Sequence, residues 1–390
     1  MKRILTYMCF IMIGISFLVT ILGSCDVMAA TQQDGEDLPF SGIASYFGEM
    51  TSPIDEDFCM PELVFAHSCT VGNDLSLNYI ILKAPLDGFE NVRLVVEKKK
   101  YNSDGSSYEM QTTTISDYSV VRMESSEKQW LRFSYNGLSA KEMGDELYAR
   151  IVAEKDGIQY ESNLDIYSIK TYAMNMLRKE ESEDKLKKLL VDMLNYGTQA
   201  QVYFQYNTGN KVNAELDEGM RLYGTTGNPD LTCFSESVLT EEATAAIVGH
   251  TLRTGSNIEL VYFLRLPMEV DLTNVEFDLS YTSTDGIFHE MIIPYDRFTY
   301  DESLNIYTCD IISVAVKDFG CKIEAKVFDV STNEKKLISD IDYYSIGAYI
   351  SNQLKNDSIG DELKSLLIEM KRYCVSAAEY FMKQTDGQNE

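Results

Sequence analysis

Two histidines occupy related places in the chain and are its first candidates for metal binding or acid–base chemistry. His67 stands in AHSCTVGND and His250 in GHTLRTGSN, each just before a segment that occurs twice. A metal site needs several converging ligands, and a general base needs a partner within hydrogen-bond reach. No carboxylate or further histidine recurs at ligand spacing around either ring. The pattern favours a structural role, with each ring hydrogen-bonded to loop backbone, and it predicts neither a metal nor a cofactor.

Other catalytic signatures are weak. The third histidine begins His289-Glu290-Met291-Ile292-Ile293, which lacks the second histidine of a zinc-protease helix and alternates like a strand. The chain contains no GxSxG elbow, phosphate loop or dinucleotide fingerprint. Paired carboxylates for glycoside hydrolysis stay an alternative, because any two acids of so acidic a chain could meet in space. The sequence favours a protein that is not an enzyme.

Aromatic rings are the remaining side chains that could bind a ligand. The chain has 25 tyrosines and a single tryptophan. Exposed aromatic faces bind sugars with little loss of side-chain entropy. Many tyrosines belong to apolar helical stripes, and those on strands and loops, with the tryptophan, form the candidate ligand-binding set: Tyr101, Tyr108, Trp130, Tyr281, Tyr295, Tyr300 and Tyr307. Ordinary sheet-face residues are the alternative interpretation of this set.

The elements that would position these side chains occur twice. YSIKTYAMNML from Tyr167 returns as YSIGAYISNQL from Tyr344, and aligning them matches 44 residues without a gap, seventeen of them identical. So many identities indicate a duplication. Apolar residues around Leu189 recur at helical spacing, as do those around Leu366. Each copy therefore predicts a helical hairpin.

Segments ahead of each hairpin also repeat, and they alternate like strands. LSLNYIIL from Leu75 matches IELVYFLR from Ile258, and AKEMGDELYARIV from Ala140 matches VKDFGCKIEAKVF from Val316. Alternation buries one face of a sheet and leaves the other in solvent, and Asp-Gly hairpin signals separate the strands. We therefore predict an α+β fold of two tandem modules, each an antiparallel, Ig-like β-sandwich followed by a two-helix hairpin.

The predicted organisation follows from the positions of the repeats. It consists of a signal peptide at 1–30, an N-terminal extension at 31–59, module 1 at 60–210 (sandwich 60–166, hairpin 167–210), a linker at 211–242 and module 2 at 243–390 (sandwich 243–343, hairpin 344–387). Each module is long enough to bury a core of its own.

The N-terminus predicts export. A short basic start, Lys2-Arg3, precedes apolar residues 4–22, which is the layout of a secretory signal. Cleavage near Ala29, lipidation of Cys25 after Leu-Gly-Ser, and an uncleaved anchor are the three alternatives. All three place the rest of the chain outside the cell, in contact with the membrane only through an N-terminus that is lipidated or uncleaved. No later apolar run approaches the ~20 residues that a membrane span needs.

The formal net charge of −27 limits the partners. It repels nucleic-acid phosphates, and no stripe of Lys and Arg interrupts it, so no nucleic-acid partner is expected. The acidic residues could keep the chain soluble through charge repulsion, and calcium binding is the alternative explanation for their number. Clusters such as Asp55-Glu56-Asp57, however, lack the spacing of a calcium loop.

Eight cysteines would suggest disulfides in an exported chain, but their positions do not repeat. Cys9 lies in the signal, and the six that follow Cys25 are Cys59, Cys69, Cys233, Cys309, Cys321 and Cys374. Six cysteines allow 15 pairings, and the sequence does not choose among them. A bridge essential to a repeated unit would recur in both copies. We therefore expect buried free thiols at Cys309 and Cys374, with a Cys309–Cys321 link as the alternative.

The first copy resembles a known module. The resemblance is carried by GLSAKEMGDELYARI, DGIQYESNLDIYSIKTYAMNML and LLVDMLNYGTQAQVYFQYNT, and it covers most of residues 60–210. The module occurs in exported proteins of Firmicutes, especially gut Clostridia, beside surface and adhesion-type domains. It has no established activity, so the resemblance implies an extracellular or cell-surface Gram-positive setting and assigns no catalytic residue. The second copy departs from the pattern, with Cys374 in place of Gly197.

The favoured function is a non-catalytic binding or adhesion-type protein. Two similar modules would raise avidity for a polysaccharide or a surface protein without new contacts. A carbohydrate-active enzyme with its site between the modules and a passive structural spacer are the alternatives. Ligand identity and oligomeric state do not follow from the sequence.

Overall fold

The computed structural model describes residues 36–37, 60–72, 74–122, 128–254, 258–267, 270–332 and 334–382. The predicted signal peptide, Cys25 and Cys59 lie outside these residues. All described residues belong to one compact unit, Asp34–Glu390. The predicted module and linker boundaries stay predictions.

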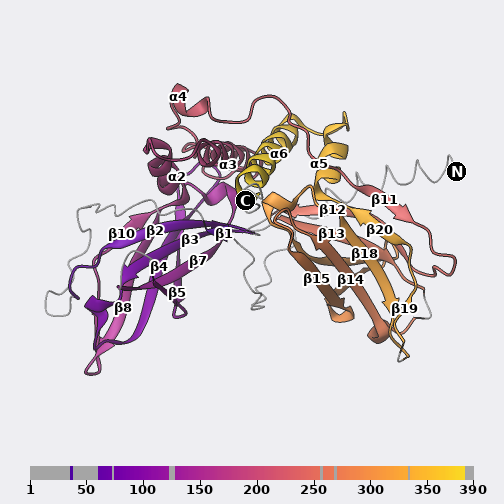
Figure 1. The fold of residues 1–390 in the computed structure, drawn as a ribbon, viewed down its shortest axis with the longest axis horizontal. Helices are drawn as coiled ribbons and strands as arrows, with labels where there is room; N and C mark the ends of the chain where they lie inside the picture. Colours follow the sequence, from indigo (N-terminus) through magenta and orange to yellow (C-terminus); the bar gives the residue numbers. More distant parts are fainter. Residues whose placement is uncertain are drawn as a thin grey trace, which may run out of the picture. The chain divides into compact units, whose positions relative to one another are not determined.

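β-Strands dominate the described chain, in four antiparallel sheets (Figure 1). The first repeat, with β1 added from the segment before it, supplies two of them, with strand orders β1-β2-β3-β7-β6 and β10-β8-β4-β5, and β9 pairs with β8. Their strands are β1 (Glu36–Asp37), β2 (Phe65–Val71), β3 (Leu75–Leu82), β4 (Glu90–Tyr101), β5 (Tyr108–Ile115), β6 (Ser119–Arg122), β7 (Gln129–Leu138), β8 (Leu147–Lys155), β9 (Ile158–Glu161) and β10 (Asp165–Tyr167).

The second repeat, with β11 added from the segment before it, supplies the other two sheets. Their strand orders are β11-β20-β18-β14-β15, with β19 on β18, and β12-β13-β17-β16. Their strands are β11 (Ser235–Val238), β12 (Ala246–Thr254), β13 (Ile258–Arg265), β14 (Val275–Thr282), β15 (Phe288–Pro294), β16 (Phe298–Asp301), β17 (Ile306–Ser313), β18 (Ile323–Asp329), β19 (Lys336–Leu337) and β20 (Ile341–Tyr344).

Strand alternation builds the sheet faces of the core as the sequence predicts. In β8, Leu147, Ala149 and Ile151 are buried, whereas Tyr148 and Arg150 between them are only partly covered. Side chains of a strand point alternately to opposite faces, so each sheet buries one apolar face.

Five α-helices lie in the described ranges. They are α2 (Ile169–Arg178), α3 (Asp184–Tyr203), α4 (Glu218–Arg221), α5 (Ile346–Leu354) and α6 (Asp361–Phe381). Ser168 and Ser345 are the N-caps of α2 and α5. The Ser168 side chain accepts a hydrogen bond from the backbone N–H of Thr171, and the Ser345 side chain accepts one from that of Ala348. Such caps satisfy N–H groups that have no partner within the helix.

The predicted fold class of two tandem modules, each an Ig-like sandwich with its own helical hairpin, is wrong. The long helix α3 packs far more extensively on α6 of the other repeat than on its neighbour α2 (Figure 1). Tyr196 of α3 stacks on Tyr373 of α6, with ring centroids 5.6 Å apart, and Lys188 Nζ lies 2.6 Å from Glu379. The buried apolar residues of both repeats form one continuous core.

The physical reason is that an apolar stripe does not identify what covers it. Leu189 and Leu366 are both buried, as the stripe requires, but the two long helices cover each other. Helical periodicity predicts the buried face alone, and the partner of that face is decided by tertiary packing.

Candidate functional site

His67 belongs to a buried cluster, here called the first histidine cluster, that joins two sheets of the first repeat. Its Nε2 atom on β2 lies 2.9 Å from Oδ2 of Asp165 on β10. Its ring stacks on Tyr167, with centroids 3.7 Å apart, and meets the edge of Tyr79 at 5.4 Å. Burial, with Asp165 nearby, raises the pKa of the Tyr79 hydroxyl.

His250 forms the second histidine cluster at the equivalent place. Its Nε2 atom on β12 lies 2.8 Å from Oδ2 of Asp342 on β20. Its ring stacks on Tyr344 at 3.7 Å and meets the edge of Tyr262 at 4.9 Å. All four residues match those of the first cluster in the repeat alignment.

The histidine clusters are placed to hold strands rather than to act on a substrate. The His67 side chain is fully buried and that of His250 is 12% exposed, so a reactant has little access to either ring. Each carboxylate stands in the strand that leads into a helix, and each histidine stands in the facing sheet. The expected partner was loop backbone, and the observed partner is a carboxylate.

The predicted aromatic residues do not converge on one site. Trp130 lies on β7, and Tyr281 on β14 stacks on His289 with centroids 4.7 Å apart. Tyr295 is 40% exposed in a short turn of helix after β15. Tyr300 on β16 lies beside Tyr307 on β17, with centroids 4.8 Å apart.

Tyr101 and Tyr108 belong to a surface that combines aromatic and charged groups. Cross-strand register pairs Tyr101 with Tyr108 and Lys99 with Met110, and Tyr148 of β8 pairs with Glu97 of β4. Because residues two apart share a face, these side chains, including that of Glu97, project from one side of the sheet. We call this surface the tyrosine face: Lys99, Tyr101, Tyr108, Met110 and Tyr148. Tyr108 is 52% exposed and Met110 is 49% exposed, and the rings of Tyr101 and Tyr108 meet edge to face at 5.8 Å.

The ammonium of Lys99 lies between two aromatic rings. Its Nζ atom is 5.1 Å from the centroid of Tyr108 and 4.9 Å from that of Tyr148. It donates a 2.8 Å hydrogen bond to the Tyr148 hydroxyl, which in turn donates to Glu146 at 2.7 Å. The hydrogen bond to Tyr148 raises the pKa of Lys99, so the charge is retained. In the described chain no carboxylate forms an ion pair with this ammonium.

A segment that follows α3 supports the tyrosine face. The Tyr206 hydroxyl accepts the backbone N–H of Tyr101 at 3.2 Å and donates to the Asp145 carboxylate at 2.5 Å. Burial raises the pKa of Asp145 to about 7. Backbone N–H of Asn207 also donates to the carbonyl of Asn102 in the β4–β5 turn, at 3.1 Å. The segment after α3 therefore holds both the end of β4 and the turn that follows it before any ligand binds.

Glycine is required in that turn. Gly105 has φ +80°, in the left-handed region that other residues rarely adopt. A Cβ atom there would also collide with the Asn207 side chain. The close approach of the turn to the segment after α3 depends on this missing side chain.

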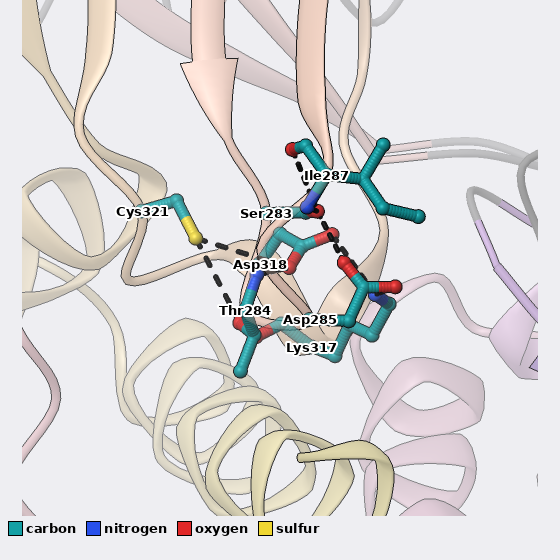
Figure 2. Close-up of polar contacts among 7 residues, drawn as sticks. All are labelled: Ser283, Thr284, Asp285, Ile287, Lys317, Asp318 and Cys321. Carbon is teal, nitrogen blue, oxygen red and sulfur yellow. Dashed lines mark hydrogen bonds and ion pairs between the residues drawn. The ribbon is translucent and has the colours of Figure 1, made fainter. Parts of the chain in front are cut away.

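A buried polar cluster lies at the equivalent turn of the second repeat (Figure 2). Lys317 Nζ lies 3.0 Å from Asp285 and 3.8 Å from Asp318, and the backbone N–H of Thr284 donates to Asp318 at 2.7 Å. Burial, with Asp318 beside it, raises the pKa of the Cys321 thiol to about 11. A thiol that stays protonated is a poor nucleophile, so this cluster holds the turn rather than performing chemistry.

No disulfide joins the cysteines of the described chain. Cys69, Cys309 and Cys374 are buried, Cys321 is half-buried and Cys233 is exposed. A Cys309–Cys321 link is not formed.

A small cavity lies where the two repeats meet, beside Tyr196 and Tyr373. Its volume is about 50 Å³, and its lining is mostly apolar apart from Asp74 and Lys141. Pockets for small molecules usually measure about 300–1,000 Å³. A sugar ring does not fit this cavity, so the tyrosine face remains the stronger candidate site.

Comparison with known proteins adds no function to this geometry. No protein-family model matches the chain, and no curated protein matches it at a significant level. Across the described ranges, no helix is long and apolar enough to cross a membrane. Within those ranges, no group of His, Cys, Asp or Glu side chains is arranged to hold a metal ion.

The residues that sequence reasoning missed are Asp145, Asp165, Asp342, Lys99 and Tyr148. The two aspartates of the histidine clusters carry a usable signal, since each stands two residues before a tyrosine that recurs in the repeat. Lys99 also carries a usable sequence signal, because it lies two residues before Tyr101 in an alternating strand.

Proposed function

We propose that the protein is a non-catalytic binding protein that acts outside the cell and binds a glycan of a cell surface or matrix on its tyrosine face. The observation that carries this proposal is the exposed Tyr108 ring beside Tyr101, with the Lys99 ammonium over it. The export pattern of the N-terminus and the resemblance to modules of surface proteins support the setting.

The surface offers both contacts that a sugar needs. The C–H groups of a pyranose pack on an aromatic face, and the sugar hydroxyls require polar partners nearby. Tyr108 supplies an accessible ring, and Met110 extends the apolar area along β5. The Lys99 ammonium and the Glu146 carboxylate supply a donor and an acceptor.

The support beneath the surface favours binding by reducing its entropic cost. Tyr206 fixes the end of β4 through Tyr101, and Asn207 fixes the β4–β5 turn. A site that is ordered before binding loses less conformational freedom when the ligand arrives. The same rigidity suits a binding surface, whereas the closed histidine clusters offer a substrate little access.

Glycan binding by matched variants tests the proposal. The protein without its predicted signal peptide is screened against neutral and acidic glycans. Affinities for the glycans that bind are then measured by calorimetry. Tyr108→Ala should lower affinity about tenfold, because the stacking face is lost. Tyr300→Ala is the control, since Tyr300 is 46% exposed beside Tyr307 in another sheet.

Two results would overturn the proposal. One is the absence of any glycan ligand in the screen. The other is a glycan whose affinity is unchanged by Tyr108→Ala, since its binding would then depend on another surface.

A further inference from the structure

We infer that the glycan bound by the tyrosine face carries a carboxylate, as the uronic acids do. This inference rests on the proposed function and names the ligand class of the same site. It follows from the position and the charge state of Lys99.

Lys99 differs from two lysines that lie over aromatic rings and also pair with carboxylates. In the described chain Lys141 and Lys155 share its arrangement, since each lies over a ring without an ion pair. Lys322 Nζ lies 3.8 Å from the Tyr343 centroid, but it also forms a 2.8 Å ion pair with Glu236. Lys335 lies over Phe328 and pairs with two carboxylates. Lys99 has a tyrosine hydroxyl as its hydrogen-bond partner, and in the described chain no carboxylate neutralises it.

The Lys99 ammonium has no ion-pair partner among the carboxylates of the described chain. The chain carries 61 acidic and 34 basic residues, so carboxylates are abundant as ion-pair partners. At Lys99 the place of a carboxylate is taken by two tyrosine rings, which attract the ammonium through their π faces. An ammonium has three N–H donors, and the bond to Tyr148 uses one of them.

The geometry fits a sugar ring and its acid group together. Lys99 Nζ lies over the Tyr108 ring, 5.1 Å from its centroid, so a pyranose packed on the exposed part of that ring brings its C5 carboxylate close to the ammonium. A charge-assisted hydrogen bond is stronger than the bond that a neutral sugar's hydroxymethyl group would make there.

The net charge of −27 does not prevent this contact. Charges on the far parts of the protein are screened beyond about 8 Å at physiological ionic strength. A short acidic oligosaccharide therefore meets mainly the local field, in which the Lys99 ammonium lies 5.1 Å from the Tyr108 centroid.

Matched ligands and matched variants test the inference. The probes are trimers of galacturonic, glucuronic and mannuronic acid, each beside its carboxyl-reduced neutral counterpart, titrated into the mature protein at physiological ionic strength. At least one acidic trimer should bind roughly fivefold to tenfold more tightly than its neutral counterpart. Lys99→Gln should abolish that difference, because glutamine can still donate to the Tyr148 hydroxyl but carries no charge. Lys322→Gln is the control and should preserve it.

The outcomes separate this inference from the proposed function. If neutral counterparts bind as tightly as the acids, or if Lys99→Gln preserves the preference, the carboxylate inference is refuted. If only neutral glycans bind, and Tyr108→Ala weakens them, the inference fails while the proposed function stands. If no glycan binds at all, both fail. An unchanged melting temperature of Lys99→Gln confirms that the variant is folded.

Discussion

Replacing Asp145 with asparagine should remove a pH dependence from the stability of the protein. Asp145 is 2% exposed, and burial raises its pKa from the ordinary 3.8 to about 7. The folded protein therefore binds this proton more tightly than the unfolded chain does. The stabilisation from the protonated carboxyl is complete below about pH 4 and is lost as the pH rises through about 7.

The magnitude follows from the difference between the two pKa values. One pKa unit corresponds to about 1.36 kcal/mol, so a pKa of about 7 in place of 3.8 corresponds to roughly 4 kcal/mol. The free energy of unfolding should fall by up to that amount between pH 4 and pH 8 through Asp145 alone. Asparagine still accepts the Tyr206 hydrogen bond but has no charge to bury, so this decline should be absent from Asp145→Asn.

Urea unfolding followed by fluorescence at several pH values measures the effect. Other buried acids, such as Asp192 and Glu369, contribute equally to both proteins and cancel in the difference. Asp104→Asn is the control, because Asp104 is exposed in the neighbouring turn and its pKa is lowered by hydrogen bonds to Ser106. Parallel stability curves for the native protein and Asp145→Asn between pH 4 and pH 8 would refute the reasoning.

Three further predictions concern stability and reactivity. His67→Ala should lower the free energy of unfolding by about 2–4 kcal/mol and His250→Ala by less, because only His67 is fully buried. Urea titration of both variants measures these losses, and equal losses would contradict the role of burial. Gly105→Ala should cost more stability than Gly286→Ala, by about 1 kcal/mol, because both glycines have positive φ but only the first faces a close side chain. Cys321 should resist alkylation at pH 8 in the folded protein and react in urea, as mass spectrometry of the labelled chain would show; rapid labelling without urea would contradict its raised pKa.

The sequence predicts local structure well because local rules determine it. Alternation identifies the buried residues of β8, and helical spacing identifies Leu189 as a core residue. The partner of an apolar stripe is a tertiary property, which is why the packing of α3 on α6 was not predicted.

The candidate site was only partly predictable. Tyr101 and Tyr108 were selected by residue type and position, and they do lie together. Their neighbour Tyr148 comes from a strand some forty residues away, and its alignment with them depends on sheet register. Asp165 is separated from His67 by 98 residues, so the sequence around His67 does not reveal the contact, and the recurrence of Asp165 before Tyr167 was its one signal.

The stacking of Tyr196 on Tyr373 has a consequence for how the protein melts. These tyrosines occupy the same position in the two copies, so each long helix shields its counterpart from water. Unfolding of one half would expose the apolar helix stripe of the other half to water. The two halves should therefore unfold together, in one cooperative transition. A calorimetric scan should therefore show a single heat-absorption peak, and a chain nicked between the copies should keep its fragments associated.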